Sequence, residues 1–182
     1  MGSRMRSKII GIGLSRTGTQ SLTDVLVDAG LNIIHYPNEQ EIYAMGNDGF
    51  TDVQGAARYR ELDMRFPNSK FIYTIRDKKT WLESCQVYFT KKSSQYLSDR
   101  ASTYRKALYG TVVWDKEYFS RAYDEHDKGI QEYFAKRPKD LLTLDLFNGD
   151  KPDKLFKFLD LPNPPDEFPH VNKLADKDWA RE

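Results

Sequence analysis

The sequence lacks the features that hold very small or membrane-embedded proteins together. It has one cysteine, Cys85, among 182 residues, so no disulfide can form within the chain. A single cysteine is typical of a reducing compartment, and we expect a cytoplasmic location. No apolar run approaches the ~18 residues of a membrane-spanning helix. The first residues also lack the apolar stretch of a secretory signal, so neither a transmembrane segment nor export is expected.

An excess of charge of either sign is missing as well. The chain carries 28 Lys and Arg against 27 Asp and Glu, a net charge of +1. Nucleic-acid-binding proteins usually have a clustered basic excess, so we expect no nucleic-acid partner. A small phosphorylated ligand remains compatible with this balance, because it needs only a local positive site. No His and Cys residues cluster at metal-ligand spacing, so no metal is expected.

The length suits one domain, which at this size buries about 70% of the surface of the unfolded chain. Residues 1–7 are polar and basic, and we expect a disordered end or the remainder of a tag. Residues 8–182 are predicted to form a single domain. No internal repeat or low-complexity tract divides them.

Apolar segments that resemble buried strands alternate with segments of helical periodicity. Strands are predicted at residues 8–14, 31–35, 70–75 and 140–146, with a short strand end at 49–53. Helices are predicted at residues 20–29, 39–45, 56–65 and 152–159, after a cap at Asp77, and over 94–136 with a break near Gly110. This alternation predicts an α/β fold with a mostly parallel central sheet covered on both faces.

The loop after the first predicted strand reads Gly13-Leu-Ser-Arg-Thr-Gly18-Thr-Gln-Ser21. Small residues at the start of a helix let backbone N–H groups approach an anion closely. The spacing of Gly13 and Gly18 copies the front half of the Walker A motif, but Thr19-Gln20 replaces the Gly-Lys that follows there. ATP or GTP hydrolysis is therefore poorly supported. Arg16 supplies positive charge instead, and the alternative is an ordinary strand-to-helix turn.

A second anion-binding signal follows the strand predicted at 70–75. Arg76 stands at its carboxyl end, the edge where open α/β sheets bind ligands. Ser84 follows eight residues later in the next helix. A guanidinium and a hydroxyl suit a phosphate group, because the arginine fork donates two parallel hydrogen bonds. Alternatively, Arg76 pairs with Asp77, and Ser84 is a surface hydroxyl.

Together these motifs resemble the small bacterial-type sulfotransferases that use 3'-phosphoadenosine 5'-phosphosulfate (PAPS). SRTGTQSL is similar to their phosphosulfate loop, TDVQGAARYRELDMRFPNSKFIYTIRDKKTWLESC to their central segment, and LLTLDLFNGDKPDKLFKFLDLPNPPDEFPHVN to their closing segment. The resemblance implies a three-layer sandwich with a P-loop NTPase-like sulfotransferase fold. It also implies a 5'-phosphosulfate site made of Arg16, Thr17, Gly18, Thr19, Gln20 and Ser21. Arg76 and Ser84 would hold the 3'-phosphate.

The resemblance implies transfer of a sulfuryl group to a hydroxyl or amine, with adenosine 3',5'-bisphosphate (PAP) as product and no metal required. Arg16 would stabilise charge on the bridging oxygen of the donor. The acceptor needs a general base, and the candidates are Asp52 and His35 near strand ends. The alternatives are that Asp52 caps a helix and that His35 is a core residue. His170 is interpreted as structural.

The sequence departs from better-known members of that family. Arg16 stands where they have lysine, and their C-terminal segment that closes over the nucleotide is missing. Asn172, Lys173 or Arg181 would replace part of it. The short chain leaves an acceptor pocket that is small, open or completed by a second subunit, so a homo-oligomer is considered.

The acceptor is a small molecule or glycan that the sequence does not specify. Tyrosines of the helical region would line an aromatic acceptor pocket or fill a core: Tyr96, Tyr104, Tyr109, Tyr118, Tyr123 and Tyr133. Trp81, Cys85 and Tyr88 are assigned to packing.

Two other functions stay open. A divergent P-loop small-molecule kinase would need Mg²⁺-dependent ATP turnover and a Walker lysine, which the loop lacks. An inactive module that binds adenosine bisphosphate would use Arg76 and Ser84 without any transfer.

Overall fold

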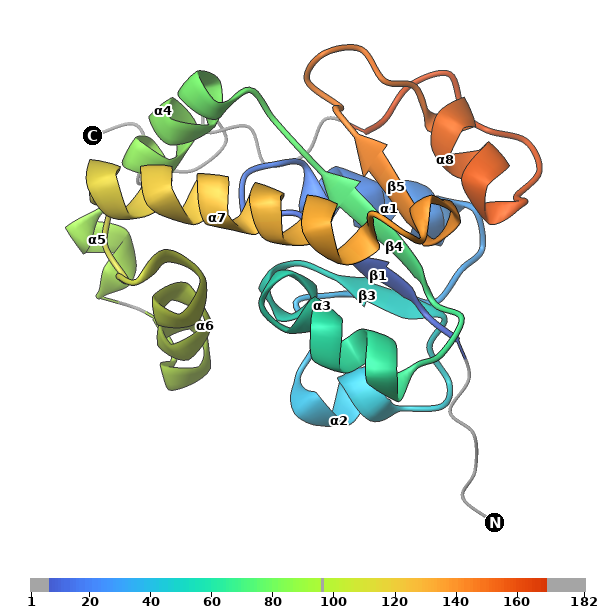
Figure 1. The fold of residues 1–182 in the computed structure, drawn as a ribbon, viewed down its shortest axis with the longest axis horizontal. Helices are drawn as coiled ribbons and strands as arrows, with labels where there is room; N and C mark the ends of the chain where they lie inside the picture. The colour runs from blue at the N-terminus through green and yellow to red at the C-terminus, as the bar shows by residue number, and fades with distance from the viewer. Residues whose placement is uncertain (1–6, 96, 170–182) are drawn as a thin grey trace.

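The fold is built on a five-stranded sheet in which every pairing is parallel. The computed structural model describes residues 7–95 and 97–169 (Figure 1). The strands are β1 (Ile9–Gly11), β2 (Ile33–His35), β3 (Gly49–Thr51), β4 (Lys70–Thr74) and β5 (Leu141–Leu144). Their order across the sheet is β2-β3-β1-β4-β5, which places β1 at the centre.

Helices cover both faces of the sheet, as Figure 1 shows. On one face lie α3 (Val53–Arg65) and α7 (Lys116–Phe134), and on the other α1 (Thr19–Asp28) and α8 (Pro152–Leu159). Successive residues of β4 show why two cores form. Phe71 and Tyr73 pack under α3 and α7, whereas Ile72 packs under α1 and α8, because side chains of a strand alternate between faces. The predicted three-layer α/β sandwich is confirmed.

A third apolar cluster lies outside the two sheet faces. It is formed where α4 (Lys78–Tyr88) and α6 (Asp99–Tyr109) meet α7, around the buried rings of Trp81, Tyr109 and Phe119. The rings of Tyr109 and Phe119 are stacked with centroids 4.6 Å apart. The remaining short helices are α2 (Glu39–Tyr43), α5 (Lys91–Ser94) and the 3-10 helix η1 (Pro138–Asp140). None of the helices in the described ranges is long and apolar enough to cross a membrane.

Most sequence predictions of elements are confirmed, with shorter strands than expected. The region predicted as one broken helix contains α5, α6 and α7, and the break at Gly110 is real, because this residue ends α6 with a φ of 72°. Asp77 caps α4, since its side chain accepts a hydrogen bond from the Thr80 N–H. Tyr109 fills the third cluster.

The packing assignments are confirmed. Trp81 and Cys85 are fully buried, and the half-buried Tyr88 packs against the third cluster and also lines a cavity described below. The predictions for His170, Asn172, Lys173, Arg181 and Tyr96 lie outside the described residues, as do residues 1–6 of the predicted N-terminal segment.

Candidate active site

The residues singled out in the sequence gather at the carboxyl edge of the sheet. The loop from Ile12 to Gly18 follows β1, His35 ends β2, Asp52 follows β3 and Arg76 comes shortly after β4. Parallel strands bring all these ends to one edge. The central strand β1 lies between β3 and β4, so the chain changes direction across the sheet here, which is where open α/β sheets bind ligands.

The loop after β1 needs its glycines for two different reasons. A Cβ on Gly13 would lie 1.9 Å from Thr74 Oγ1, so the loop approaches the end of β4 more closely than a side chain allows. Gly18 has a φ of 93°, in the left-handed region that glycine tolerates best. Arg16 also has a positive φ, 73°. The loop is therefore held in a tight, specific conformation.

Helix α1 begins at this loop without a side-chain cap. Its N-cap residue is Gly18, no side chain accepts from the first amides, and its first turn contains no acidic residue. The N–H groups of a first turn have no partner within the helix and carry the positive end of its dipole. The start of α1 is therefore suited to an anion.

Two arginines and a serine meet beside this helix end. Arg16 Nε donates to Ser84 Oγ at 3.1 Å, and Arg76 Nη1 lies 3.5 Å from the carbonyl oxygen of Arg16. Ser84 is only 3% exposed. Burial lowers the pKa of both arginines, and the charge of Arg76 lowers that of Arg16 further. An anion placed here would relieve the repulsion between the two guanidinium groups.

Aromatic rings hold these arginines in place. The Arg16 guanidinium lies 4.9 Å from the centroid of the Tyr88 ring, and that of Arg76 lies 4.3 Å from the Phe147 ring. Phe147 and Leu146 belong to the segment after β5, and their side chains also approach Gly18. Stacking on aromatic faces restrains long side chains while leaving their N–H groups available to a ligand.

Not every predicted loop residue offers its side chain to a ligand. The Thr17 hydroxyl donates to the carbonyl of Leu14 and contacts Thr74, and the Gln20 amide donates to Asp24 at 2.7 Å. These side chains stabilise the loop and α1. Thr19, Gln20 and Ser21 form the first turn of α1.

Three supports of the loop were not identified from the sequence. Trp81 Nε1 donates to the carbonyl of Ser15, the Tyr109 hydroxyl accepts from the Ser15 N–H, and His126 Nε2 donates to the carbonyl of Ile12. Burial lowers the pKa of His126, which favours the neutral ring. These residues lie 66 to 114 positions along the chain from their partners, so no local motif could have revealed them.

The two candidate bases form a pair. His35 Nε2 lies 3.4 Å from Asp52 Oδ2. Asp52 occupies the N-cap position of α3, but its side chain makes no capping hydrogen bond. Its φ of 85° is unusual for a residue with a side chain, and such strain is often found at functional sites. Burial raises the pKa of Asp52, and His35 and Arg105 oppose only part of this effect.

A chain of hydrogen bonds determines that Nδ1 of His35 carries a proton. The Thr23 hydroxyl donates to the carbonyl of Thr19, so it accepts from Thr51 Oγ1 at 2.6 Å. Thr51 has then used its proton and accepts from His35 Nδ1 at 2.9 Å. This arrangement places a ring proton on Nδ1, which also lies 3.3 Å from Thr23 Oγ1. The other ring nitrogen, Nε2, faces Asp52 Oδ2.

The pair lines a cavity of about 420 Å³ beside the loop that follows β1. The carboxyl edge of the sheet contributes Ser15, His35, Tyr36, Asp52 and Val53 to its lining. The helical side contributes Tyr88, Phe89, Leu97, Ser98, Ala101 and Arg105. Because Ser15 belongs to the loop after β1, the cavity adjoins the cluster of Arg16, Arg76 and Ser84.

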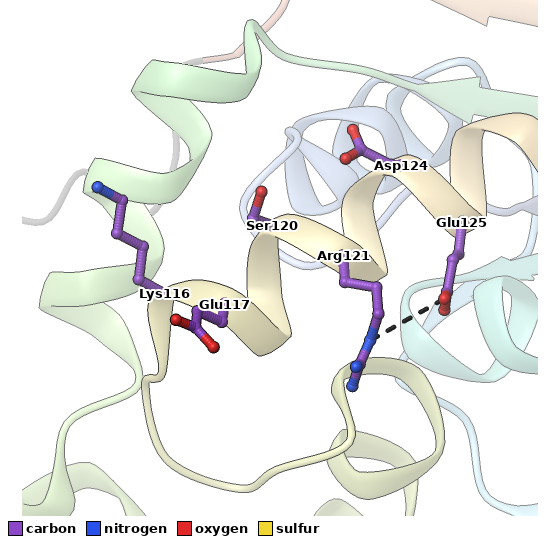
Figure 2. A pocket seen from close by; sticks show the side chains of 6 residues that line it. All are labelled: Lys116, Glu117, Ser120, Arg121, Asp124 and Glu125. Carbon is purple, nitrogen blue, oxygen red and sulfur yellow. Dashed lines mark ion pairs between the residues drawn. The ribbon is translucent and has the colours of Figure 1, made fainter.

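A second hollow on α7 differs in kind. Figure 2 shows that its lining side chains, from Lys116 to Glu125, all project from one helix. Arg121 and Glu125 are paired across one turn at 3.9 Å, with side chains 61% and 72% exposed. All the residues that line this hollow belong to α7, so it is a solvated helix face. Within residues 7–95 and 97–169, no group of acidic, His or Cys side chains is arranged to hold a metal ion.

The fold and this edge define an α/β protein with a tight strand-to-helix loop at the topological switch point of its parallel sheet. A family model described as a sulfotransferase domain matches residues 38–176, well over half of the chain, so the chain belongs to the sulfotransferase family. The matched segment includes Asp52, Arg76 and Ser84. A comparison with curated proteins found no match.

Proposed function

We propose that this protein transfers the sulfuryl group of PAPS to a hydroxyl or amine of a small acceptor, within one domain of residues 8–182. The main support is the meeting of Arg16, Arg76 and Ser84 beside the uncapped start of α1, next to a cavity that holds the His35–Asp52 pair. Two anion-binding groups adjoin one proton acceptor.

The donor side divides into two parts. The amides that open α1 and the adjoining Arg16 would hold the 5'-phosphosulfate, and Arg76 with Ser84 would hold the 3'-phosphate. Arg16 contacts Ser84, so it would link the two ends of the nucleotide. These fixed donors would stabilise negative charge that grows on the bridging oxygen as the sulfuryl group departs.

The acceptor side would supply the proton acceptor. As the acceptor oxygen or nitrogen bonds to sulfur, the bond from sulfur to the bridging oxygen breaks, PAP leaves, and the acceptor proton passes to the His35–Asp52 pair. The two residues lie 3.4 Å apart, so they would share this proton. Thr51 keeps the His35 ring in the orientation that directs Nε2 to Asp52.

The first test is calorimetric titration with PAP and with ADP. Binding that requires the 3'-phosphate and is weakened by Arg76→Ala supports the donor site. Transfer from PAPS to a panel of acceptors then tests the reaction, with Asp52→Asn as the inactive control. Equal affinity for ADP, together with Mg²⁺-dependent ATP turnover, would instead indicate the kinase function. PAP binding without transfer to any acceptor would indicate an inactive binding module.

A further inference from the structure

Arg105 is a charged side chain enclosed beside the candidate bases. It lies on α6, is 9% exposed and lines the cavity of His35 and Asp52. Its guanidinium is 4.4 Å from the centroid of the Phe89 ring, and Nη1 donates to the carbonyl of Val112 at 3.2 Å. No carboxylate of the described part of the chain forms an ion pair with it. Most of its donors thus remain available.

These donors face open space. Among the described residues, the enclosed side-chain atoms without a hydrogen-bond partner are the Tyr36 hydroxyl and Gln54 Oε1, and no atom of Arg105 is among them. The remaining N–H groups of Arg105 are therefore accessible, and the space beside them is the cavity. A buried charge that lacks an ionic partner is costly, and an anionic ligand would offset that cost.

The charged groups near Arg105 do not serve as its ionic partner. Asp52 is the carboxyl group whose charge acts on Arg105, and burial lowers the pKa of Arg105 despite it. Asp52 itself is paired with His35 at 3.4 Å. The cavity thus has a proton-accepting pair and a guanidinium that are not bonded to each other.

The walls of the cavity add a second element of recognition. Tyr36, Tyr88 and Phe89 present aromatic side chains, while Ala101 and Arg105 lie on one face of α6 and Ser98 caps its start. A volume of about 420 Å³ suits a small molecule. A flat apolar body fits between rings, and a carboxylate fits the arginine fork.

We infer that the acceptor is a small anionic molecule, with a carboxylate-type group bound by Arg105 and an aromatic or apolar body between the rings. Its hydroxyl or amine then lies toward the His35–Asp52 pair. The identity of the ligand as an acceptor rests on the proposed function, but the anion site itself does not.

Binding is tested by calorimetry in the absence of PAPS. The three ligands share a 4-hydroxyphenylethyl group and differ in the group at its end: 3-(4-hydroxyphenyl)propanoate, its amide, and tyramine. We expect wild type to bind the carboxylate at least about tenfold more tightly than the amide, and tyramine most weakly, since a hydrogen bond to a charged group is stronger than one to a neutral group. Arg105→Met keeps the apolar stem and is expected to remove the preference. Arg105→Lys, which keeps the charge, retains part of it.

The matched control is Arg121→Met, because Arg121 lies on the solvated face of α7, outside this cavity (Figure 2). It should bind all three analogues as wild type does. Equal affinity of wild type for the carboxylate and the amide overturns the inference, and this comparison needs no variant to fold. A preference that survives in folded Arg105→Met overturns it as well.

Transfer from PAPS to the same analogues separates this inference from the proposed function. Arg105-dependent binding of the carboxylate without any sulfated product means that the anion site exists and the proposed function is wrong. Equal binding and equal sulfation of carboxylate and amide means that the function holds and the anion site is wrong.

Discussion

The proposed donor side and the proposed acceptor side of the site are built in different ways. The donor side joins the loop that ends at α1 to the stretch from the end of β4 into α4, with Arg16 Nε bonded to Ser84 Oγ at 3.1 Å. The acceptor side combines the ends of β2 and β3 with the end of α4 and a face of α6. The proposed nucleotide site would therefore depend on local backbone motifs, whereas the proposed acceptor cavity depends on how distant elements pack.

The largest expected effect is a loss of kcat on the proposed acceptor side, with no change in nucleotide binding on the donor side. Asp52→Asn and His35→Gln should each lower kcat by about 10²–10⁴-fold, because the proton acceptor is lost. The double variant should be little slower than the slower single variant, since paired groups act as a unit. PAP affinity should stay unchanged. Steady-state kinetics and calorimetry measure both quantities, and additive losses would mean that the two residues act separately.

The next effect belongs to the donor side. Arg76→Ala should weaken PAP binding by about 10–100-fold, and Ser84→Ala by less, because charged hydrogen bonds contribute most. ADP affinity should change little. Lys79→Ala removes an exposed positive charge from the same helix and serves as the control. If Lys79→Ala weakens PAP binding as much as Arg76→Ala does, the effect is one of general charge.

The loop itself is tested by Gly13→Ala. The new Cβ would meet Thr74 Oγ1 at 1.9 Å, so we expect a loss of about 1–3 kcal/mol in the free energy of unfolding. Gly46→Ala is the matched control, because nothing lies within 4 Å of a Cβ there. Urea denaturation measures both. Equal stability of the two variants would show that the loop relaxes easily.

A smaller effect concerns the orientation of His35. Thr51→Val keeps the shape of the side chain but removes the hydroxyl that accepts from Nδ1. We expect kcat to fall about tenfold, as for the loss of one buried hydrogen bond worth ~1.4 kcal/mol. The pH profile of the reaction should shift while PAP affinity stays constant. An unchanged profile would mean that the ring needs no such support.

The smallest effect is on stability and depends on pH. Burial raises the pKa of Asp52 above its ordinary value of 3.8, so the folded protein binds a proton more tightly than the unfolded chain does. Stability due to this group therefore falls as pH rises above about 4. Asp52→Asn should be more stable than wild type at neutral pH, with the difference shrinking in acid. Unfolding curves at several pH values measure this difference.

Sequence periodicity predicted the order of strands and helices along the chain because it reflects local burial. It also predicted that Arg76 and the glycine-rich loop lie at strand ends. It did not find Arg105, because an arginine at helical spacing from Ser98 and Ala101 is equally typical of a solvated face. It assigned Tyr88 to packing, which is correct, but it did not show that this side chain also lines the cavity, since the apolar spacing of α4 does not show where the helix ends.

The sequence alone determined which segments are strands, where the loop glycines fall and which residues follow each strand, since these depend on neighbours along the chain. The tertiary structure decided that Asp52 and His35, offered as alternatives by the sequence, form one pair. It also decided that α6 closes the cavity beside them. Both outcomes depend on the strand order β2-β3-β1-β4-β5 and on the packing of α4, α6 and α7, which no local pattern specifies.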